Sequence, residues 1–88
     1  SVCKMVYHVR YLEHEKHQYK SWGVYAGLYC DFAGLEDCYH WMAIAAIGGD
    51  SGGPVFDENG YVIGIMSRGY IMAPMAMAVP AIYAQAEL

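Results

Sequence analysis

One short segment of this chain combines a potential nucleophile with a backbone that can turn freely. Residues 49–54 read Gly-Asp-Ser-Gly-Gly-Pro, so that Ser51 lies among glycines. A serine hydroxyl is a weak nucleophile until a base removes its proton. The oxyanion that forms when it attacks a carbonyl group needs hydrogen-bond donors that are already in place. Because glycines allow successive N–H groups to point into one concavity, the segment has the composition for both tasks.

The residues after this segment predict a β-hairpin. Residues 57–60 are turn-forming and end in Asn59-Gly60, a strong hairpin signal between two apolar stretches. Together, the serine segment and this hairpin resemble the nucleophile loop of the chymotrypsin-like serine proteases, where a strand, a turn and a second strand follow the serine. The resemblance is close over residues 43–69 and weaker from there to Ala84. No family pattern is recognised before Ala43.

The resemblance implies a catalytic role for the serine segment. Ser51 matches the catalytic nucleophile, and the backbone N–H groups of Gly49 and Ser51 match the oxyanion hole. Asp50 matches a residue that shapes the loop, and it is not the aspartate of the catalytic triad. The reaction would proceed through an acyl-enzyme and would need neither a metal nor an organic cofactor.

The resemblance also implies where a peptide substrate would bind. The residue six positions before the serine lies at the base of the primary specificity pocket in this family, and here it is an alanine, which favours an apolar substrate side chain. The segment that matches the family's substrate-binding edge strand would pair with the substrate backbone by strand addition. The implied substrate-binding residues are Ala45, Ala46, Ile47, Ser67, Arg68 and Gly69.

A histidine base and an aspartate are also needed, and in this family both precede the serine on a first β-barrel. Only 50 residues precede Ser51, and no histidine of the chain lies in the family's context. We therefore expect residues 1–88 to form a single domain, the C-terminal barrel of a two-barrel serine endopeptidase. The expected partner is an N-terminal protease half that carries the histidine and the aspartate, as a separate chain or a removed segment.

Composition supports docking on a partner. The chain is 57% apolar and only 16% charged, and a domain of 88 residues has difficulty burying so much apolar surface. The net charge of −4 and the absence of a basic patch argue against nucleic acid as a partner. Polar residues interrupt every apolar run before the roughly 18 residues of a membrane span, and no secretory signal is recognised.

Alternating apolar residues and turn signals predict six short strands. We expect an all-β fold, a six-stranded antiparallel Greek-key barrel that corresponds to the second barrel of the chymotrypsin-like fold, with a short C-terminal helix that begins at Pro80. Residues 13–20 are expected to be a loop or the tip of a long hairpin, and residues 30–37 are expected to be a loop. The expected strands cover residues 4–12, 22–29, 39–46, 54–56, 61–67 and 75–79.

The chain has three cysteines, so at least one has no internal partner. Secreted members of the family usually tie the serine loop to a later strand with a disulfide, and no cysteine follows Ser51 here. This difference favours a reducing compartment. A bridge between Cys30 and Cys38 stays open as an alternative, as does a bridge from Cys3 to another chain.

Other groups of polar residues could bind a metal or act as the base, but the sequence gives these roles less support. His14 and His17 would lie on one face of a helix as metal ligands, but their polar context favours a solvated loop. Cys30, Cys38 and His40 match no standard zinc spacing, so we expect no metal site. His40 is not expected to be the base, because a strand would hold it ~20 Å from Ser51.

A second hypothesis belongs to another class of protein. The chain could be a non-catalytic interaction or structural module, a protease half whose serine is idle. Retention of the whole Gly-Asp-Ser-Gly-Gly-Pro segment argues against this, since a scaffold does not need an oxyanion hole. A partner that places a histidine and an aspartate near Ser51 would favour the enzyme hypothesis. A partner without these residues would favour the non-catalytic module.

Overall fold

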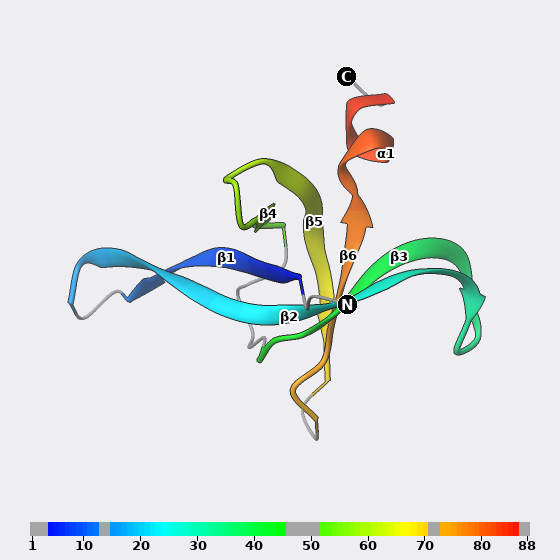
Figure 1. The fold of residues 1–88 in the computed structure, drawn as a ribbon, viewed down its shortest axis with the longest axis horizontal. Helices are drawn as coiled ribbons and strands as arrows, with labels where there is room; N and C mark the ends of the chain where they lie inside the picture. Colours follow the sequence, from blue (N-terminus) through cyan, green and yellow to red (C-terminus); the bar gives the residue numbers. More distant parts are fainter. Residues whose placement is uncertain (1–3, 13–14, 46–51, 71–72, 87–88) are drawn as a thin grey trace.

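The computed structural model describes residues 4–12, 15–45, 52–70 and 73–86, which form a closed β-barrel followed by one helical turn and a half (Figure 1). Two long hairpins extend from the barrel on opposite sides. The elements are β1 (Met5–Leu12), β2 (His17–Phe32), β3 (Leu35–Ala43), β4 (Pro54–Asp57), β5 (Val62–Gly69), β6 (Ala76–Pro80) and α1 (Ala81–Ala86).

The strand order around the barrel is β1-β2-β3-β6-β5-β4, and β4 closes the barrel by pairing with β1. Every neighbouring pair is antiparallel. Strands β4, β5 and β6 follow one another as a meander, while β3 lies beside β6, which is a Greek-key connection. The predicted all-β Greek-key barrel with a short C-terminal helix is therefore confirmed.

Alternate residues of the strands point into the barrel and fill it. Val6 of β1, Met42 of β3, Val55 of β4 and Met66 of β5 are at most 2% exposed and form one cluster. Alanines of β6 complete this core, because their small side chains leave room for the methionines that face them. Full burial of each large apolar side chain contributes about 1.5–3 kcal/mol before the loss of chain entropy is counted.

Both hairpins continue as paired strands almost to their tips, which confirms the long-hairpin alternative for residues 13–20 and shows that the loop predicted at residues 30–37 was too long. Leu12 pairs with His17, and Phe32 pairs with Leu35, so most of residues 17–20 and 30–37 belongs to strands. Polar residues fit there because these parts of the hairpins project beyond the barrel, with both faces in water. The turn between β2 and β3 has positive φ angles at Ala33 and at Gly34.

In the described ranges, no helix has the length and apolar character that crossing a membrane requires.

Candidate functional site

Some of the predicted site residues lie within the described residues, and others lie outside them. Ala46, Ile47, Gly49 and Ser51 lie outside the described residues, so the nucleophile and the oxyanion hole remain predictions. The chain is described up to Ala45 before this segment and again from Gly52 after it. These two flanking positions, with the end of β5, locate the site within the barrel.

All described parts of the predicted site lie at one end of the barrel. β3 and β5 end there, and β6 begins there, because Met42, Ala76 and Gly69 form one row of paired residues across the three strands. β4 also begins at this end, with Pro54 paired to Ile65. The topology therefore brings Ala45, which follows β3 by two residues, to the barrel end where Ser67, Arg68 and Gly69 complete β5.

Two backbone hydrogen bonds fasten the segment after the serine to β5. The N–H of Gly52 donates to the carbonyl oxygen of Met66 at 2.8 Å, and the N–H of Met66 donates to the carbonyl oxygen of Gly53 at 2.8 Å. Gly52 has a φ of 88°, a conformation that glycine adopts far more readily than other residues. Gly52, which follows Ser51, is thus held beside Met66, the residue that precedes Ser67.

The last residues of β5 pair with β6 on one side. Arg68 and Gly69 pair with β6, with a register shift at Ser67. On the other side, the pairing with β4 ends at Ile65, and the Gly52–Gly53 segment bonds to Met66. Among the described strands, Gly69 therefore lies at a sheet edge, the kind of surface to which an extended peptide can add as a strand.

The connection from β5 to β6 packs against β3. The N–H of Tyr70 donates to the carbonyl oxygen of Met75 at 3.1 Å, and the ring of Tyr70 stacks on Trp41 with centroids 6.1 Å apart. Trp41 also meets Phe32 edge to face at 5.4 Å. Sequence reasoning missed this aromatic cluster, because it joins residues that only the strand register brings together.

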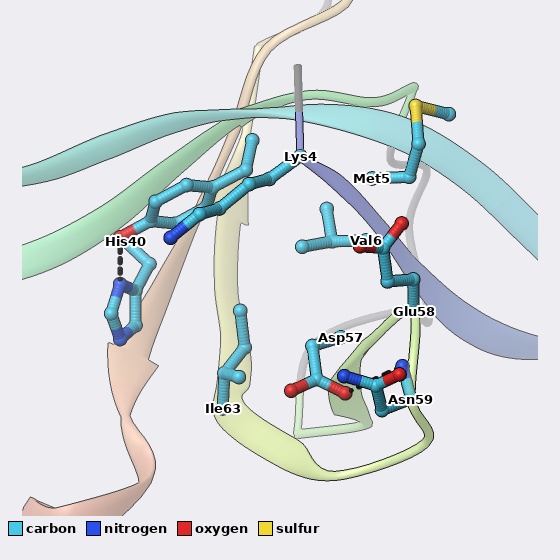
Figure 2. Close-up of a pocket in the computed structure, with 9 residues that line it drawn as sticks. Lys4, Met5, Val6, His40, Asp57, Glu58, Asn59 and Ile63 are labelled. Atoms are coloured by element: carbon cyan, nitrogen blue, oxygen red, sulfur yellow. Dashed lines mark hydrogen bonds between the residues drawn. The ribbon is translucent and has the colours of Figure 1, made fainter. Parts of the chain in front are cut away.

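His40 takes part in a different arrangement inside the barrel (Figure 2). The hydroxyl of Tyr25 and Nδ1 of His40 form a hydrogen bond of 2.7 Å. Both residues line a pocket of about 320 Å³, together with Ile63 and the turn that follows β4. Since β4 leads away from Ser51, this turn lies at the far end of that strand from the nucleophile segment. The placement agrees with the view that His40 is not the base.

Burial lowers the pKa of His40 below its ordinary value of 6.5 and is also the main cause of the raised pKa of Tyr25, to which the neighbouring Tyr29 adds. The folded state therefore binds this histidine proton less tightly than the unfolded state does. Burial of His40 therefore favours its neutral form.

The free energy of unfolding should consequently depend on pH through His40. It should be highest above pH 6.5, the unfolded value, and should fall as the pH drops towards the lowered folded pKa. Urea unfolding at a series of pH values between about 7.5 and 5 measures this. His40→Gln should flatten the slope. Equal slopes in the wild type and the variant would contradict this assignment.

The described residues of the other candidate ligand groups do not form a metal site. His17 lies at the start of β2 and not on a helix, with its Nε2 3.2 Å from a carboxylate oxygen of Glu15, and His14 lies outside the described residues. Nowhere in the described ranges do three or more histidine, cysteine, aspartate or glutamate side chains gather as potential ligands.

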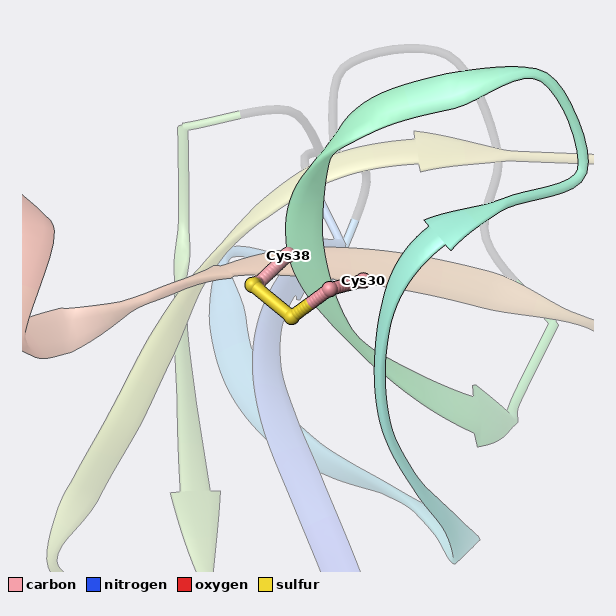
Figure 3. Close-up of a disulfide and its surroundings, with 2 residues drawn as sticks. All are labelled: Cys30 and Cys38. Atoms are coloured by element: carbon pink, nitrogen blue, oxygen red, sulfur yellow. A yellow bond between two sulfur atoms is a disulfide. The ribbon is translucent and has the colours of Figure 1, made fainter.

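Cys30 and Cys38 form a disulfide between paired positions of β2 and β3, with their Cα atoms 4.0 Å apart (Figure 3). This disulfide was one of the alternatives that the sequence allowed, and it makes both sulfur atoms unavailable as thiolate ligands of a metal. Disulfides persist mainly in oxidising compartments. The bridge therefore argues against the reducing compartment that the cysteine count had favoured. Cys3 lies outside the described residues.

A protein-family model matches most of the described part of the chain. The model of the family described as Trypsin matches residues 33–87, from the turn between β2 and β3 through the C-terminal helix. This range includes the Gly-Asp-Ser-Gly-Gly-Pro segment and all six substrate-binding positions predicted above. No curated protein matches the chain.

Proposed function

This chain belongs to the trypsin family of serine proteases, and on that premise we propose that it supplies Ser51 as the nucleophile of a serine endopeptidase. The family match extends over more than half of the chain and agrees with the resemblance found in the sequence. The observation that carries the proposal is the intact Gly-Asp-Ser-Gly-Gly-Pro segment within the matched range.

The proposed reaction has two steps. The hydroxyl oxygen of Ser51 attacks the substrate carbonyl carbon while a histidine takes its proton, and the N–H groups of Gly49 and Ser51 stabilise the oxyanion. The C–N bond then breaks, the histidine returns the proton to the leaving amine, and an acyl-enzyme remains. In the second step water attacks this ester with the same histidine as base, which releases the acid and restores Ser51.

The base and the aspartate are proposed to come from polypeptide beyond the described residues of this chain. His8 is 1% exposed inside the barrel, and His40 is hydrogen-bonded to Tyr25 in its own pocket. His17 lies where the β1–β2 hairpin turns back. Of these three, His8 lies beside the start of β4, where it pairs with Val55, but its side chain is buried in the barrel interior. A protease half with a histidine and an aspartate remains the partner that the chemistry requires.

The proposed substrate is a peptide with an apolar side chain at the cleavage site. Ala45, Ala46 and Ile47 would line the pocket for that side chain, because this stretch has no acidic residue to pair with lysine or arginine. Backbone groups of Ser67 and Gly69 would bond to the extended substrate along the end of β5. Exposed Arg68 points to solvent contact and does not define the pocket.

A fluorophosphonate probe tests the proposal. Such a probe forms a covalent bond only with an activated serine, so protein purified from its natural source with its partner should gain one probe mass, and peptide mapping should place it on Ser51. Ser51→Ala should abolish the gain. An unlabelled Ser51 in the folded, partner-bound protein would overturn the proposal and leave the non-catalytic module. The isolated chain is not the test material, because it lacks the base.

A further inference from the structure

The pocket beside His40 lies at the end of β4 that points away from the nucleophile segment, and the proposed reaction does not use it. Its volume is about 320 Å³, which lies within the range of cavities that bind small molecules. Strands β1, β2, β3 and β5 contribute to its wall, together with the end of β4 and the turn that follows. Side chains from so many elements converge here only because the barrel is closed.

The apolar part of the pocket is continuous with the barrel core. Val6 is 2% exposed and belongs to the core cluster, and Ile63 and Tyr25 pack against that cluster. The hydrogen bond of 2.7 Å between Tyr25 and His40 holds these two side chains in place. An apolar ligand group would therefore contact a surface that is already ordered, and it would release water from that surface.

Three charged side chains surround this apolar part, two carboxylates and one ammonium group. Figure 2 shows Asp57 and Glu58 on the opposite side of the pocket from His40. Lys4 and Glu58 are exposed, while Asp57 is half-buried. In the part of the chain that the structure describes, no side chain of opposite charge lies within ion-pair distance of any of the three. The pocket therefore offers charges that its own residues do not neutralise by direct contact.

Asp57 is held in a fixed orientation by the turn that it begins. One of its carboxylate oxygens, Oδ1, accepts hydrogen bonds from the backbone N–H groups of Asn59 and Tyr61, both at 2.9 Å. Among the described residues, no hydrogen bond uses the second oxygen, Oδ2. A carboxylate that is already oriented, with one oxygen available, is a strong acceptor for a charged donor.

We propose that this pocket binds a primary alkylammonium ion, with its ammonium group at Asp57 and Glu58 and its alkyl chain against Val6 and Ile63. Two carboxylates and one ammonium group leave the pocket with one net negative charge, which favours a monocation over an anion. Burial favours the neutral form of His40, so the imidazole does not oppose this charge. The inference does not depend on the role of Ser51.

Lys4 determines how well such a cation binds. Its ammonium group carries the same charge as the ligand, and its side chain is exposed, so it can extend into solvent when the pocket is filled. A ligand with a negative group would instead bind to Lys4. The sign of the effect of removing Lys4 therefore distinguishes an ammonium ligand from an anionic one.

The test uses n-hexylammonium chloride as the probe, added to the full chain in the state in which it is purified. The imidazole proton signals of His40 in the NMR spectrum report on the pocket, and His40→Gln identifies them by their loss. They should shift in a saturable manner, with a Kd on the order of 1 mM for a ligand of this size. Hexanol has the same alkyl chain without the charge and should bind at least about tenfold more weakly. Hexanoate should cause no saturable shift.

Substitutions assign the contacts. Asp57→Asn removes the charge but keeps an oxygen for the two N–H groups of the turn, and it should weaken hexylammonium binding about tenfold. Glu58→Gln alters an exposed side chain and should weaken binding about threefold, whereas Lys4→Gln should strengthen it by a similar factor. Glu36→Gln is the matched control, because it removes one exposed carboxylate from the β2–β3 hairpin and should leave the affinity unchanged.

The outcomes decide between the possible occupants. Equal affinities for hexanol and hexylammonium would mean that the pocket recognises only the alkyl chain, and this result would overturn the ammonium site. Tighter binding of hexanoate, lost in Lys4→Gln, would assign an anion to the pocket against the inference. A wild-type chain whose His40 signals do not respond to hexylammonium, or an affinity that Asp57→Asn and Glu58→Gln both leave unchanged, would also overturn it. Unchanged circular dichroism shows that each variant is folded.

Discussion

Gly23→Ala is expected to remove most of the stability of the barrel. A Cβ atom at this position would lie 2.4 Å from the carbonyl oxygen of Ala43 and 2.7 Å from Cβ of Ile44. Neither neighbour can move aside alone, because one is a backbone atom and the other belongs to a side chain that is 2% exposed in the core. β2 and β3 would have to separate where Val24 pairs with Ala43.

The expected loss is at least about 3 kcal/mol, at the severe end of overpacking in a core. The free energy of unfolding of a small domain is only about 5–15 kcal/mol, so a large part of the stability would be lost. Urea unfolding followed by circular dichroism measures the difference. Gly60→Ala is the control: its nearest neighbour would be the Tyr7 hydroxyl at 3.9 Å, so only the cost of a positive φ applies. Equal unfolding midpoints for the two variants would show that the strands are not packed this closely.

This close approach also has a consequence for the site. Ile44, which meets Gly23, lies immediately before Ala45, the first residue assigned to the specificity pocket. A strand that shifts at Ala43 would carry the pocket residues with it. Gly23 therefore links the stability of the barrel to the placement of the substrate side chain, although it does not itself contact the site.

Local signals made much of the fold predictable. The alternation in residues 4–12 and the Asn59-Gly60 turn located β1 and the β4–β5 hairpin to within two residues. The full length of β2 was not predictable, because residues 17–20 are polar and hairpin pairing outside the barrel leaves no apolar pattern. The barrel order came from the resemblance to a family and not from periodicity.

For the site, the sequence identifies candidate chemistry but not contacts between distant residues. The glycines around Ser51 are neighbours in sequence, so one motif shows them together. The hydrogen bonds between Gly52 and Met66, and between Tyr25 and His40, join residues 14 and 15 positions apart. The ring contacts of Tyr7 with Trp22 and Phe56 depend on two separate strand registers. A change of one residue in either register would turn one of these side chains to the other face.

Gly52→Ala is expected to have the largest effect on the proposed catalysis of any substitution outside Ser51, the proposed nucleophile. Gly52 combines a φ of 88° with an N–H that donates to Met66 at 2.8 Å. Alanine at such an angle costs about 1–2 kcal/mol. Rotation of the backbone would relieve that strain, break the hydrogen bond and displace Ser51, which is the adjacent residue. Because a 1 Å misplacement of a reacting group can cost about 100-fold in rate, the folded protein should react much more slowly.

The measurement is the rate of fluorophosphonate labelling of the partner-bound protein, which we expect to fall roughly 100-fold in Gly52→Ala. Gly34→Ala is a matched control. Gly34 also has a left-handed φ, 79°, and open space around its Cα, but it lies in the turn between β2 and β3. Both variants should lose similar stability, and only Gly52→Ala should lose labelling. If Gly52→Ala is labelled at the wild-type rate, the bond to Met66 does not position Ser51. If both variants are labelled more slowly than the wild type by the same factor, the cause is a general loss of folding.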